Sequence, residues 1–438
     1  MRKARSPGAS FPTRLTRQKT RLARVATLAC ALGAAGLSLA ATGCEAIRNG
    51  ANPEMPLWLQ RPNSAMQVNY TRKLVAPSRR AGEPYERGQP EIDPVGKRVF
   101  TGSSDNGLYA LRAANGEQIW RFETTGFVQC APLYDPVEDV VYFGSNDGAF
   151  YKIAAKDGKL RWRFMSNAEV SRRPVLQNGL LYVVNANDTL LALEPDTGKV
   201  RWSQHRSPAT GMEVAGYAGP ALFRGKVYTG FSDGNVVAYD ALTGAERWQP
   251  VDLAAEAEQT LGEVPQQLDV DTTPVPNMLP SGPVVYVASY AGGVFALDAE
   301  TGVQVWPNAA VTGVSELTLW REPAHARRDG GPPEPARTIL IASSGTSGLW
   351  GLDPETGREL WRREVPSGGV SAPVPINGAL LVTASRMGIF LLSPLGGELI
   401  DGIHVSDGAS MTPSAYGGRA FVMTNGGTFL SLTVPPPI

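Results

Sequence analysis

The chain has 438 residues, of which 42% are hydrophobic, and it contains 48 glycines and 35 prolines. This composition favours a turn-rich all-β protein over a helical one. The formal net charge is zero, but residues 1–43 hold eight Lys or Arg side chains and no acid, which leaves 33 basic against 41 acidic side chains in the remainder. Because nucleic-acid binding depends on cationic contacts to phosphates, this acidic balance argues against a nucleic-acid partner.

Residues 1–43 are predicted to form a signal peptide, since a basic segment is followed by an apolar run, 25–41, that is too short for a stable membrane span. Small residues lie directly before Cys44, an arrangement that resembles the bacterial lipobox. Cys44 is therefore predicted to be lipidated and to become the mature N-terminus. The alternative is cleavage after Ala40, which leaves Cys44 as a plain thiol.

Residues 44–66 lack periodicity and are predicted to form a flexible tether, followed by one repetitive domain over 67–438. In the mature domain Cys130 is the remaining free cysteine, so the fold cannot rely on internal disulfides. Cys130 is expected to be a buried structural thiol. The three histidines lie too far apart for a zinc site or a Cys–His pair; they are His205, His325 and His404.

One phrase recurs along the domain: a glycine followed four residues later by tryptophan. The six pairs are Gly116/Trp120, Gly158/Trp162, Gly198/Trp202, Gly244/Trp248, Gly302/Trp306 and Gly357/Trp361. A seventh copy keeps Gly397 but places Asp401 at the tryptophan position. A short apolar strand precedes each turn, and eight such strands recur at intervals of 40 to 58 residues.

Each repeat is predicted to be a four-stranded antiparallel meander, because three strands precede the turn and one follows it. A unit of about 40 residues is the size of a propeller blade. In the turn at residues 353–357, Pro354 presets the backbone, Asp353 bonds its own backbone, and Gly357 supplies the left-handed conformation. The fourth-strand tryptophan is expected to pack into the neighbouring blade, so the phrase is interpreted as structural.

The count of strands predicts an eight-bladed β-propeller whose ring is closed by an N-terminal strand. Eight third strands occur, but only seven turn-to-fourth-strand phrases, so the last blade lacks a strand. Residues 68–75 resemble a fourth strand with Tyr70 at the tryptophan position. Closure removes exposed sheet edges. The alternative, a seven-bladed ring, leaves one set of strands unexplained.

The phrase Ala296-x-Asp298-x-x-Thr301-Gly302-x-x-x-Trp306 resembles the repeat of pyrroloquinoline-quinone (PQQ) type propellers, and the resemblance extends over 68–434. In that family the repeat tryptophans dock between blades. Eight blades, a closing strand and a lipoprotein signal resemble, within the family, the outer-membrane lipoproteins that bind the β-barrel assembly machinery as scaffolds. The resemblance implies a non-catalytic, monomeric scaffold for protein–protein interaction, anchored in the outer membrane and facing the periplasm.

Two other functions remain open at this point: a quinoprotein dehydrogenase with PQQ and calcium, and a propeller that binds envelope glycan. The sequence contains neither the adjacent cysteine pair nor the haem-attachment motif of quinoprotein alcohol dehydrogenases, so no catalytic, cofactor or metal residue is predicted. Charged residues lead into the first strands and are candidate rim contacts: Glu169, Arg172, Arg173, Glu213, Asp269, Asp271 and Glu316. Inner-membrane anchoring and a soluble periplasmic form remain alternatives.

Two insertions interrupt the repeat and are candidate docking elements, because loops carry function more often than blade sheets. Residues 251–268 are acidic and alanine-rich, and their first part is compatible with a short helix. Residues 321–337 lie between the first two strands of the sixth blade and are expected to form a surface loop. Blade topology predicts that the two insertions project from opposite ends of the ring.

Overall fold

The computed structural model describes residues 65–75, 85–207, 217–262, 269–325, 331–365 and 368–436. These residues belong to one compact unit, Arg61–Ile438. The predicted signal peptide, Cys44 and all but the last two residues of the predicted tether lie outside the described residues. No helix in the described ranges has the length and apolar character needed to cross a membrane.

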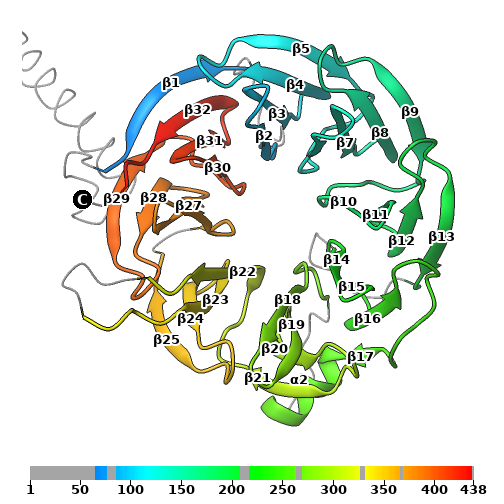
Figure 1. The fold of residues 1–438 in the computed structure, drawn as a ribbon, viewed down its shortest axis with the longest axis vertical. Helices are drawn as coiled ribbons and strands as arrows, with labels where there is room; N and C mark the ends of the chain where they lie inside the picture. Colours follow the sequence, from blue (N-terminus) through cyan, green and yellow to red (C-terminus); the bar gives the residue numbers. More distant parts are fainter. Residues whose placement is uncertain are drawn as a thin grey trace, which may run out of the picture. The chain divides into compact units, whose positions relative to one another are not determined.

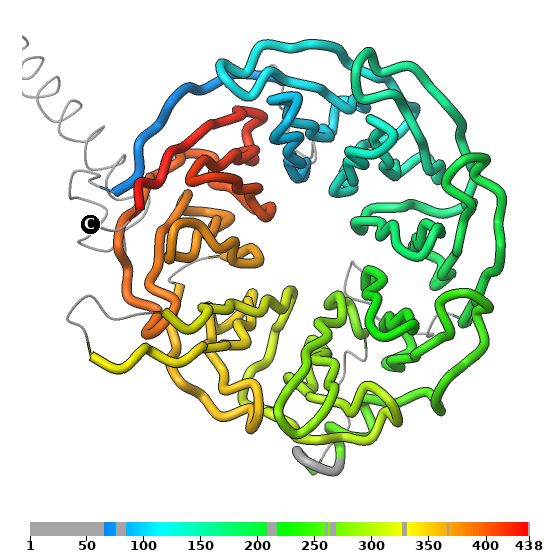
Figure 2. The backbone as a smooth tube through the Cα atoms, in the orientation of Figure 1, coloured from blue at the N-terminus to red at the C-terminus, as the bar shows by residue number. Residues whose placement is uncertain are grey.

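The unit is a ring of eight four-stranded antiparallel sheets, which confirms the predicted all-β, eight-bladed propeller (Figure 1). Each blade runs outward, so its first strand lies nearest the ring axis and its fourth strand forms the outer wall (Figures 1 and 2). Blade 1 consists of β2 (Pro90–Asp93), β3 (Arg98–Gly102), β4 (Gly107–Arg112) and β5 (Gln118–Glu123). Blade 2 consists of β6 (Leu133–Asp135), β7 (Val140–Gly144), β8 (Ala149–Ala154) and β9 (Leu160–Met165).

The next blades follow in chain order. Blade 3 consists of β10 (Val175–Gln177), β11 (Leu180–Asn185), β12 (Thr189–Leu193) and β13 (Val200–His205). Blade 4 consists of β14 (Ala221–Phe223), β15 (Lys226–Gly230), β16 (Asn235–Asp240) and β17 (Val251–Asp252). Blade 5 consists of β18 (Val275–Leu279), β19 (Gly282–Ser289), β20 (Gly293–Asp298) and β21 (Gln304–Asn308). Blade 6 consists of β22 (Val314–Glu322), β23 (Arg337–Ser344), β24 (Gly348–Leu352) and β25 (Glu359–Arg363). Blade 7 consists of β26 (Val374–Ile376), β27 (Ala379–Ala384), β28 (Gly388–Leu392) and β29 (Leu399–His404). Blade 8 consists of β30 (Ser414–Tyr416), β31 (Arg419–Met423), β32 (Thr428–Thr433) and the N-terminal strand β1 (Gln67–Lys73).

The ring closes through the N-terminal strand, as predicted. Strand β1 pairs antiparallel with β32 and forms the outer strand of blade 8. The seven-bladed alternative is therefore excluded. Because the first and last strands of the domain share one sheet, the ring has no open blade at which a strand from another chain would add.

The structure refines the predicted bounds of both insertions. Residues 251–252 still belong to blade 4, as β17, and the helix α2 (Leu253–Leu261) follows directly. Asp252 accepts hydrogen bonds from the backbone N–H groups of Ala254 and Ala255, and Gly262 ends the helix in the left-handed conformation. The second insertion is shorter than predicted because the strands β22 and β23 extend to Glu322 and from Arg337.

The recurring tryptophans lie at the junctions between blades. In five junctions the indole Nε1–H donates to a backbone carbonyl three residues before the turn glycine of the next blade, over 2.8 to 3.2 Å. The pairs are Trp120–Ala155, Trp162–Pro195, Trp202–Ala241, Trp306–Pro354 and Trp361–Pro394. Tyr70 reproduces the contact at the eighth junction, since its hydroxyl donates to the carbonyl of Ala113 at 3.0 Å.

Trp248 differs from the other repeat tryptophans. It lies ahead of the short strand β17, and its buried Nε1 has no hydrogen-bond partner among the described residues. The equivalent carbonyl, that of Ala299, accepts from the hydroxyl of Tyr228 alone, whereas the carbonyl of Ala241 accepts from both Tyr182 and Trp202. The irregular outer edge of blade 4 therefore keeps the apolar part of this contact without its hydrogen bond.

The turn glycines allow each aromatic ring to approach the neighbouring backbone. Gly357 adopts φ 70°, and a Cβ there would come within 2.4 Å of the indole of Trp306. Asp353 accepts from the backbone N–H groups of Glu355 and Thr356 at 2.9 and 3.0 Å, which fixes the turn. The other turn glycines adopt the same left-handed conformation; they are Gly116, Gly158, Gly198, Gly244, Gly302 and Gly397.

Blade 7 has an acid where the other blades have an aromatic ring. Asp401 is buried, and its Oδ2 accepts hydrogen bonds from the backbone N–H groups of Ala65 and Met66 at 2.9 and 2.7 Å. Met66 is 3% exposed and packs in the core cluster between blades 7 and 8. The segment that enters β1 therefore fills the junction that a tryptophan fills elsewhere.

Replacing Trp361 with alanine is expected to lower the free energy of unfolding by about 3–5 kcal/mol, because the change opens a cavity between blades 6 and 7. Trp361→Phe retains an aromatic ring and should lose less. Urea unfolding followed by circular dichroism measures both. Unfolding curves that match wild type in both variants would contradict the docking role.

Replacing Asp401 with alanine is expected to lower the free energy of unfolding by about 2–4 kcal/mol, because the partly buried N–H of Ala65 and the buried N–H of Met66 lose a charged acceptor. Asp196→Ala, at an exposed turn position, serves as the control. The same urea titration compares the two variants, and equal losses would show that Asp401 does not hold the entering segment.

Candidate functional site

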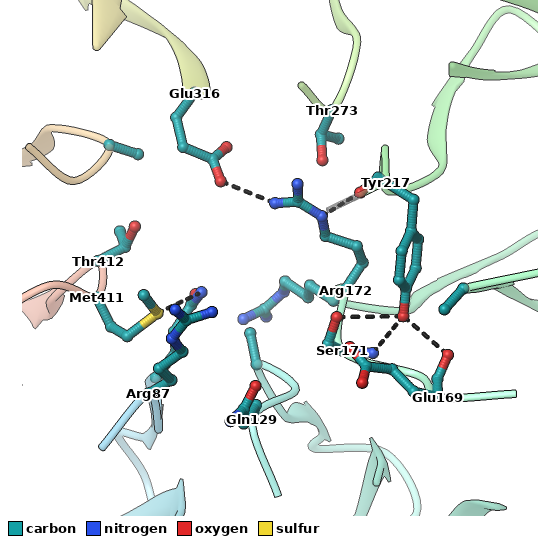
Figure 3. A pocket seen from close by; sticks show the side chains of 15 residues that line it. Arg87, Gln129, Glu169, Ser171, Arg172, Tyr217, Thr273, Glu316, Met411 and Thr412 are labelled. Atoms are coloured by element: carbon teal, nitrogen blue, oxygen red, sulfur yellow. Dashed lines mark hydrogen bonds and ion pairs between the residues drawn. The ribbon is translucent and has the colours of Figure 1, made fainter. Parts of the chain in front are cut away.

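One mouth of the central channel forms a cavity of about 620 Å³. Its lining comes from all eight blades, mainly from the segments that lead into the first strands (Figure 3). The lining residues are Arg87, Gln89, Gln129, Ala131, Glu169, Ser171, Arg172, Arg173, Ala186, Tyr217, Thr273, Glu316, Ala372, Met411 and Thr412. Ala257 of α2 packs on the β19–β20 loop, where a Cβ at Gly292 would lie 3.1 Å from its side chain. The equivalent β11–β12 loop of blade 3 contributes Ala186 to the cavity, so α2 and the cavity lie at the same end of the ring.

Arg172 connects four consecutive blades across the cavity. It precedes β10 of blade 3, and its Nη1 donates to Oε1 of Glu316, on β22 of blade 6, at 3.0 Å (Figure 3). Its Nη2 donates to the backbone carbonyl of Asp271, ahead of blade 5, at 2.6 Å. Its Nε donates to the backbone carbonyl of Tyr217, ahead of blade 4. One guanidinium group therefore holds the segments of blades 4, 5 and 6 in place.

Arg173 extends in the other direction around the ring and contacts blade 1. Its Nη1 and Nη2 each donate to one carboxylate oxygen of Glu91, on β2, at 2.7 Å. Bidentate pairs of this kind combine charge with fixed geometry. Two adjacent arginines thus extend to opposite sides of the ring, and each is matched by a carboxylate.

Two buried acidic side chains, those of Asp269 and Asp271, lie near Arg172. Asp269 and Asp271 are 2% and 6% exposed. The pKa of Asp271 is raised to about 7: burial is the main cause, Arg172 opposes the shift, and the nearby Glu316 and Asp269 add to it. The Oδ1 of Asp271 has no hydrogen-bond partner among the described residues. Burial also raises the pKa of Glu316, against the effect of Arg172.

The structure brings together most of the predicted rim residues. Glu169, Arg172, Arg173 and Glu316 line the cavity, and Asp269 and Asp271 lie buried beside it. Glu213 lies outside the described residues. These residues converge because each one precedes or begins the first strand of its blade.

Three residues of the site escaped the sequence prediction: Glu91, Tyr217 and Arg87. The hydroxyl of Tyr217 donates to the carbonyl of Glu169 at 2.9 Å and accepts from the backbone N–H of Ser171 at 2.6 Å. Glu91 directly follows Pro90, one of the prolines that recur before first strands, so its position near the axis was readable from the sequence. Its pairing with Arg173 across blades was not.

The charged groups of the mouth do not fit a calcium ion. Calcium needs several oxygen ligands that converge on one point. Here Glu91 and Glu316 are each engaged by an arginine, and Arg172 lies beside the Asp271 backbone. No group of three or more metal-ligating side chains occurs in the described ranges. We therefore assign no residue of the mouth to a PQQ–calcium centre.

Cys130 is buried and free among the described residues. Burial raises the pKa of its thiol to about 12. A thiol with so high a pKa is almost entirely protonated at neutral pH, which disfavours a nucleophilic role.

Asp271→Asn is expected to stabilise the fold at high pH. The pKa of Asp271 rises from 3.8 to about 7 on folding. The folded chain therefore binds more protons than the unfolded chain between these values, and stability falls as pH rises from about 4 to about 7. Asparagine cannot ionise, so the variant should exceed wild type above pH 7 by up to about 4 kcal/mol and match it near pH 4. Urea unfolding at pH 4 and pH 8 measures this difference, and the same difference at both pH values would contradict it.

Comparison with known sequences relates the chain to one family. The family model described as outer membrane protein assembly factor BamB matches residues 136–319 and 308–434. BamB of Legionella pneumophila (strain Paris) is 26% identical over 233 residues, which are 53% of this chain and 54% of that protein. BamB of Yersinia pestis is 27% identical over 321 residues, 67% of this chain and 68% of that protein. The alignments thus span about half to two thirds of these relatives.

The same repeat also occurs in enzymes. The quinohemoprotein alcohol dehydrogenase ADH-IIG of Pseudomonas putida is 24% identical over 294 residues, which are 53% of this chain but 39% of that enzyme. Among solved structures, BamB from Moraxella catarrhalis superposes with a TM-score of 0.63 at 18% identity and covers 84% of this chain and 99% of that chain. This similarity confirms the fold.

The family model spans most of the propeller, from blade 2 to the end of β32, and the ring contains the eight blades and the closing strand that the repeat predicts. The chain therefore belongs to the outer membrane protein assembly factor BamB family of PQQ-type β-propellers.

Proposed function

We propose that this protein is a non-catalytic scaffold of the bacterial envelope that assists the assembly of outer-membrane β-barrel proteins. Family membership supports this role, because the relatives are named as outer-membrane assembly factors. In this proposal the mature chain is a monomer, anchored in the outer membrane by lipid on Cys44 and facing the periplasm.

The observation that carries the proposal is the pairing of charged side chains at the channel mouth. Arg172 and Arg173 pair with Glu316 and Glu91 from opposite sides of the ring. These pairs engage the carboxylates of Glu316 and Glu91, and they fix the loops of several blades relative to one another. A site of this kind presents a preformed surface to a protein partner.

The docking surface in this proposal is the end of the ring that carries the cavity and α2. Loops from all eight blades meet there, and the hydrogen bonds of Arg172 join those of blades 3, 4, 5 and 6. The distant dehydrogenase relatives support a second candidate, a quinoprotein enzyme, but the donor set of the mouth does not fit its calcium ion. The scaffold is therefore the function that we propose.

A gentle detergent pull-down of the full chain with a C-terminal tag, followed by mass spectrometry, tests this proposal. We expect to recover the outer-membrane barrel assembly machinery without bound quinone, and to find an acylated Cys44 at the mature N-terminus. Glu316→Gln and Arg172→Ala should reduce recovery of the partner, since both loosen the mouth, whereas Arg358→Gln, at an exposed position just before β25, should not.

Recovery of quinone and calcium without barrel machinery would overturn the scaffold. An unmodified Cys44 would overturn the lipid anchor while leaving the docking proposal in place.

A further inference from the structure

The outer wall of the propeller carries a regular row of protruding residues. In seven of the eight outer strands a β-bulge skips one residue, the one directly before the tryptophan position. A bulge leaves its extra residue unpaired and blunts the sheet edge. The seven residues are Ile119, Arg161, Arg201, Val305, Leu360, Ile400 and Asn69.

The chemistry of this row changes around the ring. The bulge residue is apolar in blades 1, 5, 6 and 7, polar in blade 8 and cationic in blades 2 and 3, which carry Arg161 and Arg201. The cationic bulge residues therefore lie on two neighbouring blades.

Strands β9 and β13, with the lysine that directly precedes each strand, form one cationic surface, which we call the basic wall. Its exposed cations are Lys159, Arg161, Arg163, Lys199 and Arg201. The two strands are neighbours on the outer wall (Figure 1). Trp162 of β9 packs so closely on Gly198, just ahead of β13, that a Cβ there would lie 2.8 Å from the indole.

The basic wall contrasts with the rest of the protein. Its two strands contain no acid, although 41 acidic side chains outnumber 33 basic ones over residues 44–438. Acids occur only in the adjoining turns, where Asp157 pairs with Lys159 at 2.9 Å. In β1, by comparison, Arg72 and Lys73 donate to backbone carbonyls and are used within the fold.

Large apolar side chains are interspersed among these cations. Leu160, Met165 and Val200 are 50%, 47% and 44% exposed. Alternating cations and exposed apolar groups suit the boundary of a lipid bilayer, where the cations meet headgroup phosphates and the apolar groups enter the acyl boundary. An acidic protein surface would pair with the cations but would leave these apolar side chains without a matching contact.

We propose that the basic wall binds the anionic headgroup surface of a membrane. Each such Lys or Arg near an anionic membrane raises affinity about fivefold, so five cations on one face set the side on which the propeller lies. The outer wall runs parallel to the ring axis. When the basic wall lies on the membrane, the ring axis is therefore parallel to the membrane plane, and the channel mouth faces sideways rather than toward the membrane. This proposal does not depend on the lipid anchor or on the partner at the mouth.

A dye at Val200 tests the contact. The chain without its predicted signal peptide, residues 44–438, carries Cys44→Ser, so that an environment-sensitive fluorophore labels only an added cysteine, since Cys130 is buried. Val200→Cys places the dye on the basic wall. Val305→Cys places it at a similarly exposed site on blade 5, where Val305 is 47% exposed. Vesicles of phosphatidylglycerol or of phosphatidylcholine are then added to each labelled protein.

We expect a blue shift at position 200 with phosphatidylglycerol vesicles, little shift with phosphatidylcholine, and little at position 305 with either. Arg161→Gln with Arg201→Gln should abolish the shift. The control pair Arg112→Gln with Arg358→Gln, which removes two exposed cations from other blades, should retain it.

Three results would overturn the proposal. They are equal shifts at both dye positions, no shift at position 200, and a shift that survives Arg161→Gln with Arg201→Gln. Excess free phosphate should not displace the vesicles, because displacement would indicate simple anion binding rather than a lipid surface.

Discussion

The fold depends on the contact between one aromatic ring and the turn of the next blade. A four-stranded sheet cannot bury both faces by itself, so each blade needs its neighbours. The ring at the end of one repeat packs on the turn glycine of the following repeat and donates to a carbonyl three residues earlier, as Trp120 and Tyr70 do at their junctions. Repeated around the ring, this contact fixes the spacing of the blades and so the position of every loop at the channel mouth.

The two junctions that depart from the rule are informative. Blade 7 replaces the aromatic ring with Asp401, which binds the segment that enters the ring. The departure thus lies where the chain must join its own end, and a tryptophan there would compete with Met66 for the same space. Blade 4 keeps Trp248 but loses its hydrogen bond, next to the helix α2 that follows the blade.

The sequence was sufficient to predict the fold, because the glycine-to-tryptophan spacing repeats and the missing strand could be recognised around Tyr70. It also placed Arg172 and Glu316 at the channel mouth, since first strands lie nearest the axis. It did not reveal which charges pair: Arg172 and Glu316 are 144 residues apart, and their contact depends on the curvature of the whole ring. The bulges were hidden for a related reason, because a skipped residue is defined only by strand pairing.

In the two proposals made here the protein is a scaffold that contacts a partner protein at the channel mouth and lipid at the basic wall, while Asp401 holds the segment that enters β1. The most direct test of the central claim is site-specific photo-cross-linking in living cells, from Thr273 or Thr412 at the mouth and from Glu322 at the opposite end of the ring. We predict cross-links to the outer-membrane barrel assembly machinery from the mouth only. Cross-links from Glu322 but not from the mouth would contradict the account.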